Sequence, residues 1–81
     1  MARRPANDLR FSQPIRLRDG TRLVRLADAA QFLAALPRER LTGPLFTAGA
    51  LVSKAVERAG AREVEDARHE LIRAFRAEGW L

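Results

Sequence analysis

Cysteine and tyrosine are absent from this chain of 81 residues, and histidine, tryptophan and methionine occur once each. Without thiols, the chain can hold neither a disulfide framework nor a thiolate metal site. Nucleophiles are scarce too, because only Ser12 and Ser53 carry serine hydroxyls and neither stands in a nucleophile motif. A chain of this length has room for one small domain. We therefore expect a protein that is not an enzyme and has no catalytic residues.

Metal and cofactor motifs are lacking as well. The acids near the start of the last predicted helix point to different sides of it, and they suit the helix dipole. The glycines form neither a phosphate-binding loop nor a dinucleotide fingerprint. His69 follows Glu65 by four residues, which fits a base with an orienting carboxylate, although we favour a solvated pair. We expect no metal site and no cofactor.

No long hydrophobic run is present either. The chain has no stretch near the roughly 20 apolar residues that span a bilayer. Arg3 and Arg4 lie at the start of the sequence, but no apolar segment of signal-peptide length follows them. We therefore expect a soluble, cytoplasmic protein without a membrane partner.

Arginine is abundant, and it is distributed unevenly. The net charge is +5; residues 1–40 carry nine arginines against four acids, whereas the charges of residues 41–81 balance. Residues 1–11 are polar, basic and without periodicity, which predicts a disordered basic arm. We expect Leu9 and Phe11 to attach the end of this arm to a single domain over residues 12–81.

Strict alternation of apolar and polar residues from Pro14 onward predicts a β-hairpin. The pair Asp19-Gly20 favours a two-residue type I′ turn, which puts Ile15 opposite Val24. A three-residue loop would split the apolar residues between the two faces. One face then collects Ile15, Leu17, Val24 and Leu26, with Arg22 near its tip. The other face presents Leu23 and three exposed arginines, Arg16, Arg18 and Arg25.

Three helices are expected after the hairpin. Asp28 is predicted as the N-cap of a short helix over 29–36, which Pro37 ends. A second helix, over 44–59, is rich in alanine and ends at Gly60 as its C′ residue. A third runs over 63–78 with Gly79 as its C-cap, and Trp80 folds back onto the core or a partner. Because a two-stranded hairpin is not stable alone, we predict an α+β domain of order ββααα, with the N-terminal antiparallel hairpin packed on the three helices.

Several of these elements occur together in a known family. They are the Pro14-Ile15 start of the hairpin, the Asp19-Gly20 turn, the Asp28-Ala29-Ala30 start of a short helix, Gly60, and Ala67-Arg68 ahead of Glu78-Gly79. In their order and spacing, residues 12–80 resemble domain of unknown function 982, a family of small proteins chiefly from rhizobia and related alphaproteobacteria. The chain departs from the family pattern at Leu36, where Trp is usual, and at Leu71, where Phe is usual. The resemblance implies a small intact cytoplasmic domain and supplies no catalytic residue.

Two functions stay open. We favour a non-catalytic protein-interaction module, self-associating as a homodimer or binding another protein, through the hairpin edge, the alanine-rich helix or Trp80 as an anchor. The alternative is nucleic-acid binding by the arm together with Arg16, Arg18 and Arg25. Outward arginines also protect a sheet from aggregation, and the helices are neutral overall, so this alternative ranks second. Arg68 has two interpretations as well, a structural contact, which we favour, or an anion contact.

Overall fold

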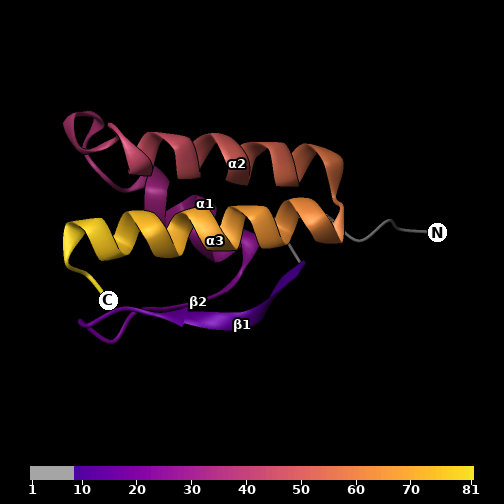
Figure 1. Ribbon diagram of the computed structural model, residues 1–81, viewed down its shortest axis with the longest axis horizontal. Helices are drawn as coiled ribbons and strands as arrows, with labels where there is room; N and C mark the ends of the chain where they lie inside the picture. Colours follow the sequence, from indigo (N-terminus) through magenta and orange to yellow (C-terminus); the bar gives the residue numbers. More distant parts are fainter. Residues whose placement is uncertain (1–8) are drawn as a thin grey trace.

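Two antiparallel strands followed by three α-helices make up residues 9–81, the part of the chain that the computed structural model describes (Figure 1). The elements are β1 (Arg10–Arg16), β2 (Arg22–Arg25), α1 (Leu26–Ala34), the short 3₁₀ helix η2 (Arg38–Arg40), α2 (Pro44–Arg58) and α3 (Ala61–Glu78). The predicted α+β order ββααα is confirmed. Most of the predicted arm lies outside the described residues, but Leu9 and Phe11 pack on the core, and β1 begins at Arg10.

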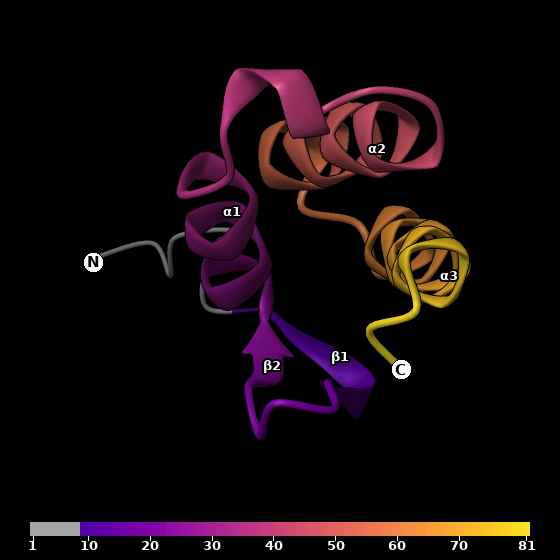
Figure 2. The same ribbon diagram turned by 90° about the vertical axis from the view of Figure 1, so that its left-hand side faces the viewer.

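The core lies between the hairpin and the helices. An end-on view places α2 and α3 side by side, α1 across from them, and the hairpin beneath (Figure 2). The contact between α2 and α3 is the most extensive of the fold. Four of its residues are fully buried alanines, which allow the two helices to approach closely, namely Ala48, Ala55, Ala67 and Ala74. The large side chains that fill the remaining centre are Leu26, Leu45, Leu71 and Phe75.

The hairpin uses a three-residue loop, so the predicted two-residue turn is wrong. Ile15 lies opposite Leu23, and the N–H of Leu17 donates to the carbonyl of Thr21 (2.9 Å) across the loop. Gly20 takes the left-handed position, with φ of 95°, and its N–H donates to the carbonyl of Leu17 (3.1 Å). This is the geometry of a type I turn followed by a glycine bulge, in which Asp19 keeps a negative φ.

The changed register moves Leu23 into the core and Val24 toward the surface. Leu23 is 2% exposed and packs beside Ile15, whereas Val24 is half-buried. The three-residue loop therefore separates Val24 from the apolar face, as expected, but Leu26 does not follow it because Leu26 belongs to α1 and not to the strand. Leu26 is the first residue of α1 and is fully buried there.

Helix α1 begins at Leu26, three residues earlier than predicted, because Asp28 caps it from within the first turn and not from the N-cap position. Arg25 is the N-cap and Asp28 occupies the third helical position. The carboxylate of Asp28 accepts the main-chain N–H groups of Val24 (2.9 Å) and Arg25 (3.0 Å). In a capping box, the acid at the third helical position accepts the N–H of the N-cap residue, as Asp28 does for Arg25. The same carboxylate also gives an acceptor to the Val24 N–H, on the outer edge of β2.

The corner between α2 and α3 turns at an alanine and not at the predicted glycine. Ala59 adopts the left-handed conformation, with φ of 55°, and its N–H donates to the carbonyl of Ala55 (2.8 Å). Gly60 is extended and is the N-cap of α3, because its carbonyl already accepts the N–H of Val64 (3.1 Å). For a residue with a Cβ atom, the left-handed conformation is less favourable than the right-handed one by about 1–2 kcal/mol.

We expect Ala59→Gly to raise the free energy of unfolding by about 0.5–1 kcal/mol. Glycine removes the left-handed strain but gives the unfolded chain more conformational freedom, so part of the gain is lost. Gly79, at the end of α3, is the matched opposite case: its φ is 78° and an added Cβ would meet no atom within 4 Å. Gly79→Ala should therefore destabilise by a similar amount. Denaturant unfolding of both variants measures this, and an Ala59→Gly protein less stable than wild type would contradict it.

Candidate functional site

Trp80, the predicted anchor for a partner, packs inside its own domain. The end of α3 forms a Schellman motif, in which the N–H of Gly79 donates to the carbonyl of Arg76 (3.1 Å) and the N–H of Trp80 to that of Phe75 (2.8 Å). This geometry turns the indole onto the rings of Phe32 and Phe75, with centroids 5.8 Å away in each case. Trp80 therefore ties α1, α3 and the C-terminal segment together; a contact with a partner stays a prediction.

The outer edge of β1 is closed by α3 and by the residues that follow it. The N–H of Ser12 donates to Oε1 of Glu65 (3.1 Å), and the carbonyl of Gln13 accepts Nε of Arg68 (3.1 Å). The main-chain N–H of Arg18 donates to the carbonyl of Trp80 (2.8 Å). The strand register is irregular between Arg10 and Ile15, so α3 side chains serve the backbone groups of this stretch. Such an edge is not free to add another strand.

Through these contacts, Arg68 and Glu65 bind main-chain groups of β1. Nε of Arg68 makes a structural contact, but its partner is a main-chain carbonyl and not the acid that we expected, and an anion contact of Arg68 stays a prediction. Hydrogen bonding by the Ser12 hydroxyl lowers the pKa of Glu65, and the Ser12 N–H and the charges of Arg68 and His69 act in the same direction, against desolvation. His69 forms the expected solvated pair with Glu65, at 3.9 Å and with its side chain 72% exposed.

The predicted hairpin arginines are all exposed, but they do not form one set. Arg16 lies directly opposite Arg22, which we had placed on the apolar face, because the longer loop shifts the register by one residue. Arg25 pairs with Arg10 at the far end of the hairpin. Arg18 lies in the loop, where its Nε donates to the main-chain oxygen of Leu81 (2.7 Å). The hairpin therefore carries two cross-strand pairs of exposed arginines, Arg16 with Arg22 near the loop and Arg10 with Arg25 at the other end.

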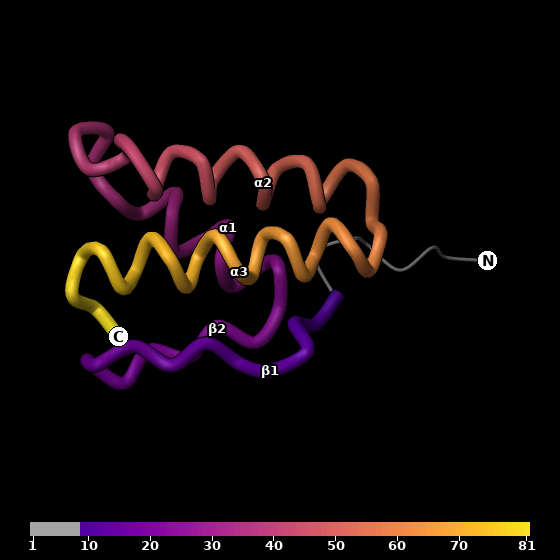
Figure 3. The backbone as a smooth tube through the Cα atoms, viewed as in Figure 1, coloured from indigo at the N-terminus to yellow at the C-terminus, as the bar shows by residue number. Residues whose placement is uncertain are grey.

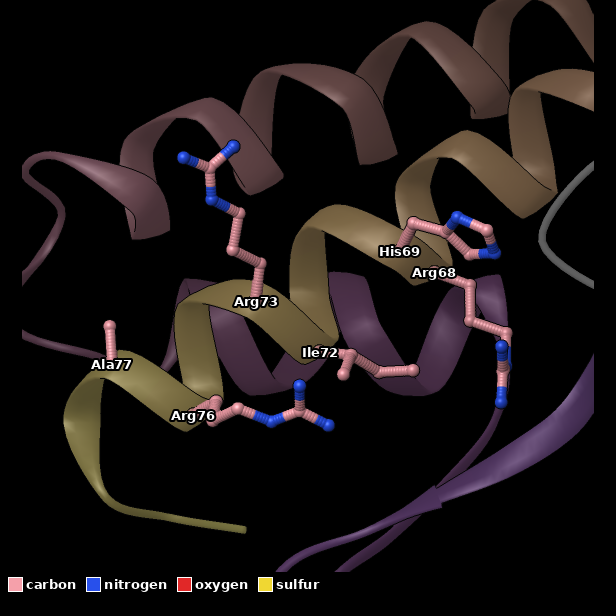
Figure 4. Close-up of a pocket in the computed structure, with 6 residues that line it drawn as sticks. All are labelled: Arg68, His69, Ile72, Arg73, Arg76 and Ala77. Atoms are coloured by element: carbon pink, nitrogen blue, oxygen red, sulfur yellow. The ribbon is translucent and has the colours of Figure 1, made fainter.

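A basic groove runs along the exposed side of α3, and sequence reasoning did not single it out. Figure 4 shows its side chains, and its volume is about 520 Å³. Arginines supply most of its polar groups; it is lined by Arg68, His69, Ile72, Arg73, Arg76 and Ala77. Arg73 is held only loosely, since its distance to Glu70 is 3.8 Å and its side chain is 76% exposed. The signal in the sequence was the recurrence of arginine on the polar face of this helix.

An apolar groove of about 410 Å³ lies between α1 and α2, and sequence reasoning missed its main residue. Phe46 is 65% exposed, the one large hydrophobic residue that is exposed in the described chain. Small residues dominate the rest of the lining, which comprises Ala30, Leu33, Ala34, Leu41, Leu45, Gly49, Ala50, Val52 and Ser53. The signal was a phenylalanine one position off the buried stripe of α2, where an amphipathic helix normally carries a polar residue.

Two other classes of site find no support within residues 9–81. No three histidine, aspartate or glutamate side chains gather there in a way that can hold a metal ion. No helix in this part of the chain is long and apolar enough to cross a bilayer.

We expect Trp80→Ala to lower the free energy of unfolding by about 2–3 kcal/mol. The substitution removes two aromatic contacts and opens a cavity beside Phe75, and the loss is less than for a fully buried ring because Trp80 is half-buried. Thermal and denaturant unfolding measure this. A melting temperature equal to that of wild type would show that the indole does not hold the C-terminal segment.

We expect Glu65→Gln to reduce the stability by about 0.5–1 kcal/mol at neutral pH, a small loss because water screens this exposed carboxylate. The lowered pKa means that Glu65 stabilises the fold above its ordinary value of 4.5, and that this contribution is lost as the pH falls through the folded pKa. The unfolding curves of variant and wild type should therefore converge in acid. Glu57→Gln, on the exposed side of α2, is the control, and equal acid sensitivity of all three proteins would contradict the assignment.

No family model matches the chain, and neither curated proteins nor solved structures gave a match. Membership in the domain of unknown function 982 family therefore stays a prediction from the residues quoted above.

Proposed function

We propose that this protein is a non-catalytic interaction module that self-associates through the groove between α1 and α2. The observation that carries the proposal is Phe46, an aromatic ring left 65% exposed at an apolar hollow. Exposed apolar patches of this kind mark interaction surfaces in folded proteins. The occupant that we propose is a second copy of this chain, and charge and shape both favour it.

The charge argument starts from the lining of the groove. None of its ten residues is charged, although charged residues make up 31% of the chain. Two copies carry +5 each and repel one another at most surfaces. The groove is lined by residues of α1, of α2 and by Leu41, whereas Arg68, Arg73 and Arg76 line a separate groove on α3. The residues that line this groove therefore bring no like charges into the contact.

The shape argument is that the same surface holds a projection and a hollow. Phe46 projects, while Ala30, Ala34, Gly49 and Ala50 leave space beside it. A two-fold axis through such a surface places each Phe46 in the hollow of the other copy, as an isologous dimer requires. Burying each ring contributes about 1–2 kcal/mol, which is small against the cost of association. We therefore expect a weak, concentration-dependent dimer.

We also propose that the protein acts in the cytoplasm and has no enzymatic activity. The scarcity of nucleophiles and the absence of cysteine from the sequence support the second statement. Binding of a different protein at the same groove is the competing possibility, and the next experiment separates the two.

Sedimentation velocity from about 10 µM to about 1 mM tests the dimer, a range that covers weak affinities. Wild type should shift from monomer toward dimer across this range. Ala50→Glu, which places a charge inside the groove, should stay monomeric, and Phe46→Ser should weaken the dimer by about tenfold or more. A wild-type protein that is monomeric at the highest concentration would rule out self-association.

Thr47→Glu is the matched control, because it makes the same charge change on the exposed surface of α2, outside the groove. It should dimerise like wild type. Equal loss of the dimer in Thr47→Glu and Ala50→Glu would assign the effect to net charge and would contradict the proposed interface.

A further inference from the structure

We propose that the exposed surface along β1 and α3 binds the phosphate backbone of duplex nucleic acid without reading its sequence. The residues that form it are the seam arginines, namely Arg16, Arg22, Arg68, Arg73 and Arg76. This surface is separate from the α1–α2 groove, so the two proposals stand independently.

The first step is the alignment of β1 with α3. Ser12 is bonded to Glu65 near the start of both elements, and Arg18 is bonded to Trp80 beyond their ends. The two elements therefore run side by side in the same direction, as the tube in Figure 3 shows. Arg16 lies between these two attachments, as do Arg73 and Arg76 on the helix. The fold thus places the strand that carries Arg16 beside the helix whose groove is lined by Arg68, Arg73 and Arg76.

The second step is that these charges are largely uncompensated. Within residues 9–81, no ion pair involves Arg16, Arg22 or Arg76, and Arg73 has only the long contact to Glu70. Like charges directly opposite in a hairpin are destabilising, and Arg16 and Arg22 are such a pair. Glu65, an acid on α3, accepts the Ser12 N–H of β1 and forms no ion pair with these arginines in the described residues. A bound polyanion would relieve this repulsion.

The third step identifies the polyanion by its chemistry. Guanidinium groups bind phosphate through two parallel hydrogen bonds. From Arg68 to Arg76 the helix rises about 12 Å, and one strand of a duplex carries one phosphate per about 3.4 Å of its axis, so these arginines can reach more than one phosphate. A membrane surface fits less well, because the exposed apolar residue Phe46 is on α2, away from the seam.

The fourth step concerns the form of the nucleic acid. The described aromatic residues lie elsewhere: Phe11 and Phe75 are buried, Phe32 and Trp80 pack on each other, and Phe46 is on α2. The seam therefore offers no ring on which unstacked bases can lie, as single-strand binding requires. Contacts to phosphates alone position a protein without reading bases. Sequence-independent binding to a duplex follows.

Fluorescence anisotropy with two unrelated duplexes of about 20 base pairs tests the proposal, starting at about 50 mM salt. Both duplexes should bind with equal affinity, more tightly than a single strand, and log K should fall linearly with log salt. The double variant Arg73→Gln/Arg76→Gln should weaken binding by about tenfold or more and reduce the slope by about 1.8, since each phosphate contact contributes about 0.9. Arg16→Gln/Arg22→Gln should have a similar effect from the other element.

Arg58→Gln/Arg62→Gln is the matched control, because it removes the same two charges at the α2–α3 corner. It should bind like wild type, and circular dichroism checks that each variant is folded. No binding at low salt, or equal weakening by the control, would overturn the proposal. So would equal competition by polyglutamate, which would indicate an acidic polypeptide, or tighter binding to vesicles of anionic phospholipid than to the duplex.

Discussion

The outer edge of β1 is the constraint on which this fold depends. A two-stranded sheet is not stable alone, because each strand has an edge of unpaired backbone groups. Here α3 supplies the missing partners through Glu65 and Arg68, and the Schellman turn after it supplies the carbonyl of Trp80. The same helix packs on α2 through fully buried alanines. The hairpin and the helices are therefore one cooperative structure, joined along α3.

Closing this edge determines which surfaces are left for partners. Strand addition to β1 is blocked where α3 covers it, and Trp80 is used within the chain. What stays exposed is a neutral apolar groove between α1 and α2 and a basic surface along β1 and α3. The two surfaces suit different partners, since apolar contact favours a second protein chain and guanidinium groups favour phosphate. We propose one role for each of them.

Much of the fold could be predicted from local patterns. The order of the elements and the glycine cap at Gly79 follow from periodicity and capping rules, whereas the sequence left Trp80 open between the core and a partner. The errors lie where two local signals compete. Asp19-Gly20 fits a two-residue or a three-residue loop, and the burial of Leu23 against the helices selects the longer one. Ala59 takes the turn, because the carbonyl of Gly60 already belongs to α3.

The sequence by itself determined the class of the protein: a small α+β domain with few nucleophiles, no thiols and an excess of arginine. Periodicity and composition are local properties, so they can be read without knowing which elements meet. Only the tertiary structure decided where the arginines gather and which aromatic ring stays exposed. Arg16 and Arg76 lie on neighbouring elements because α3 is hydrogen-bonded to β1, and Phe46 is exposed because it lies beside the buried stripe of α2 and not in it. Such juxtapositions depend on contacts between residues distant in the chain, which no local pattern records.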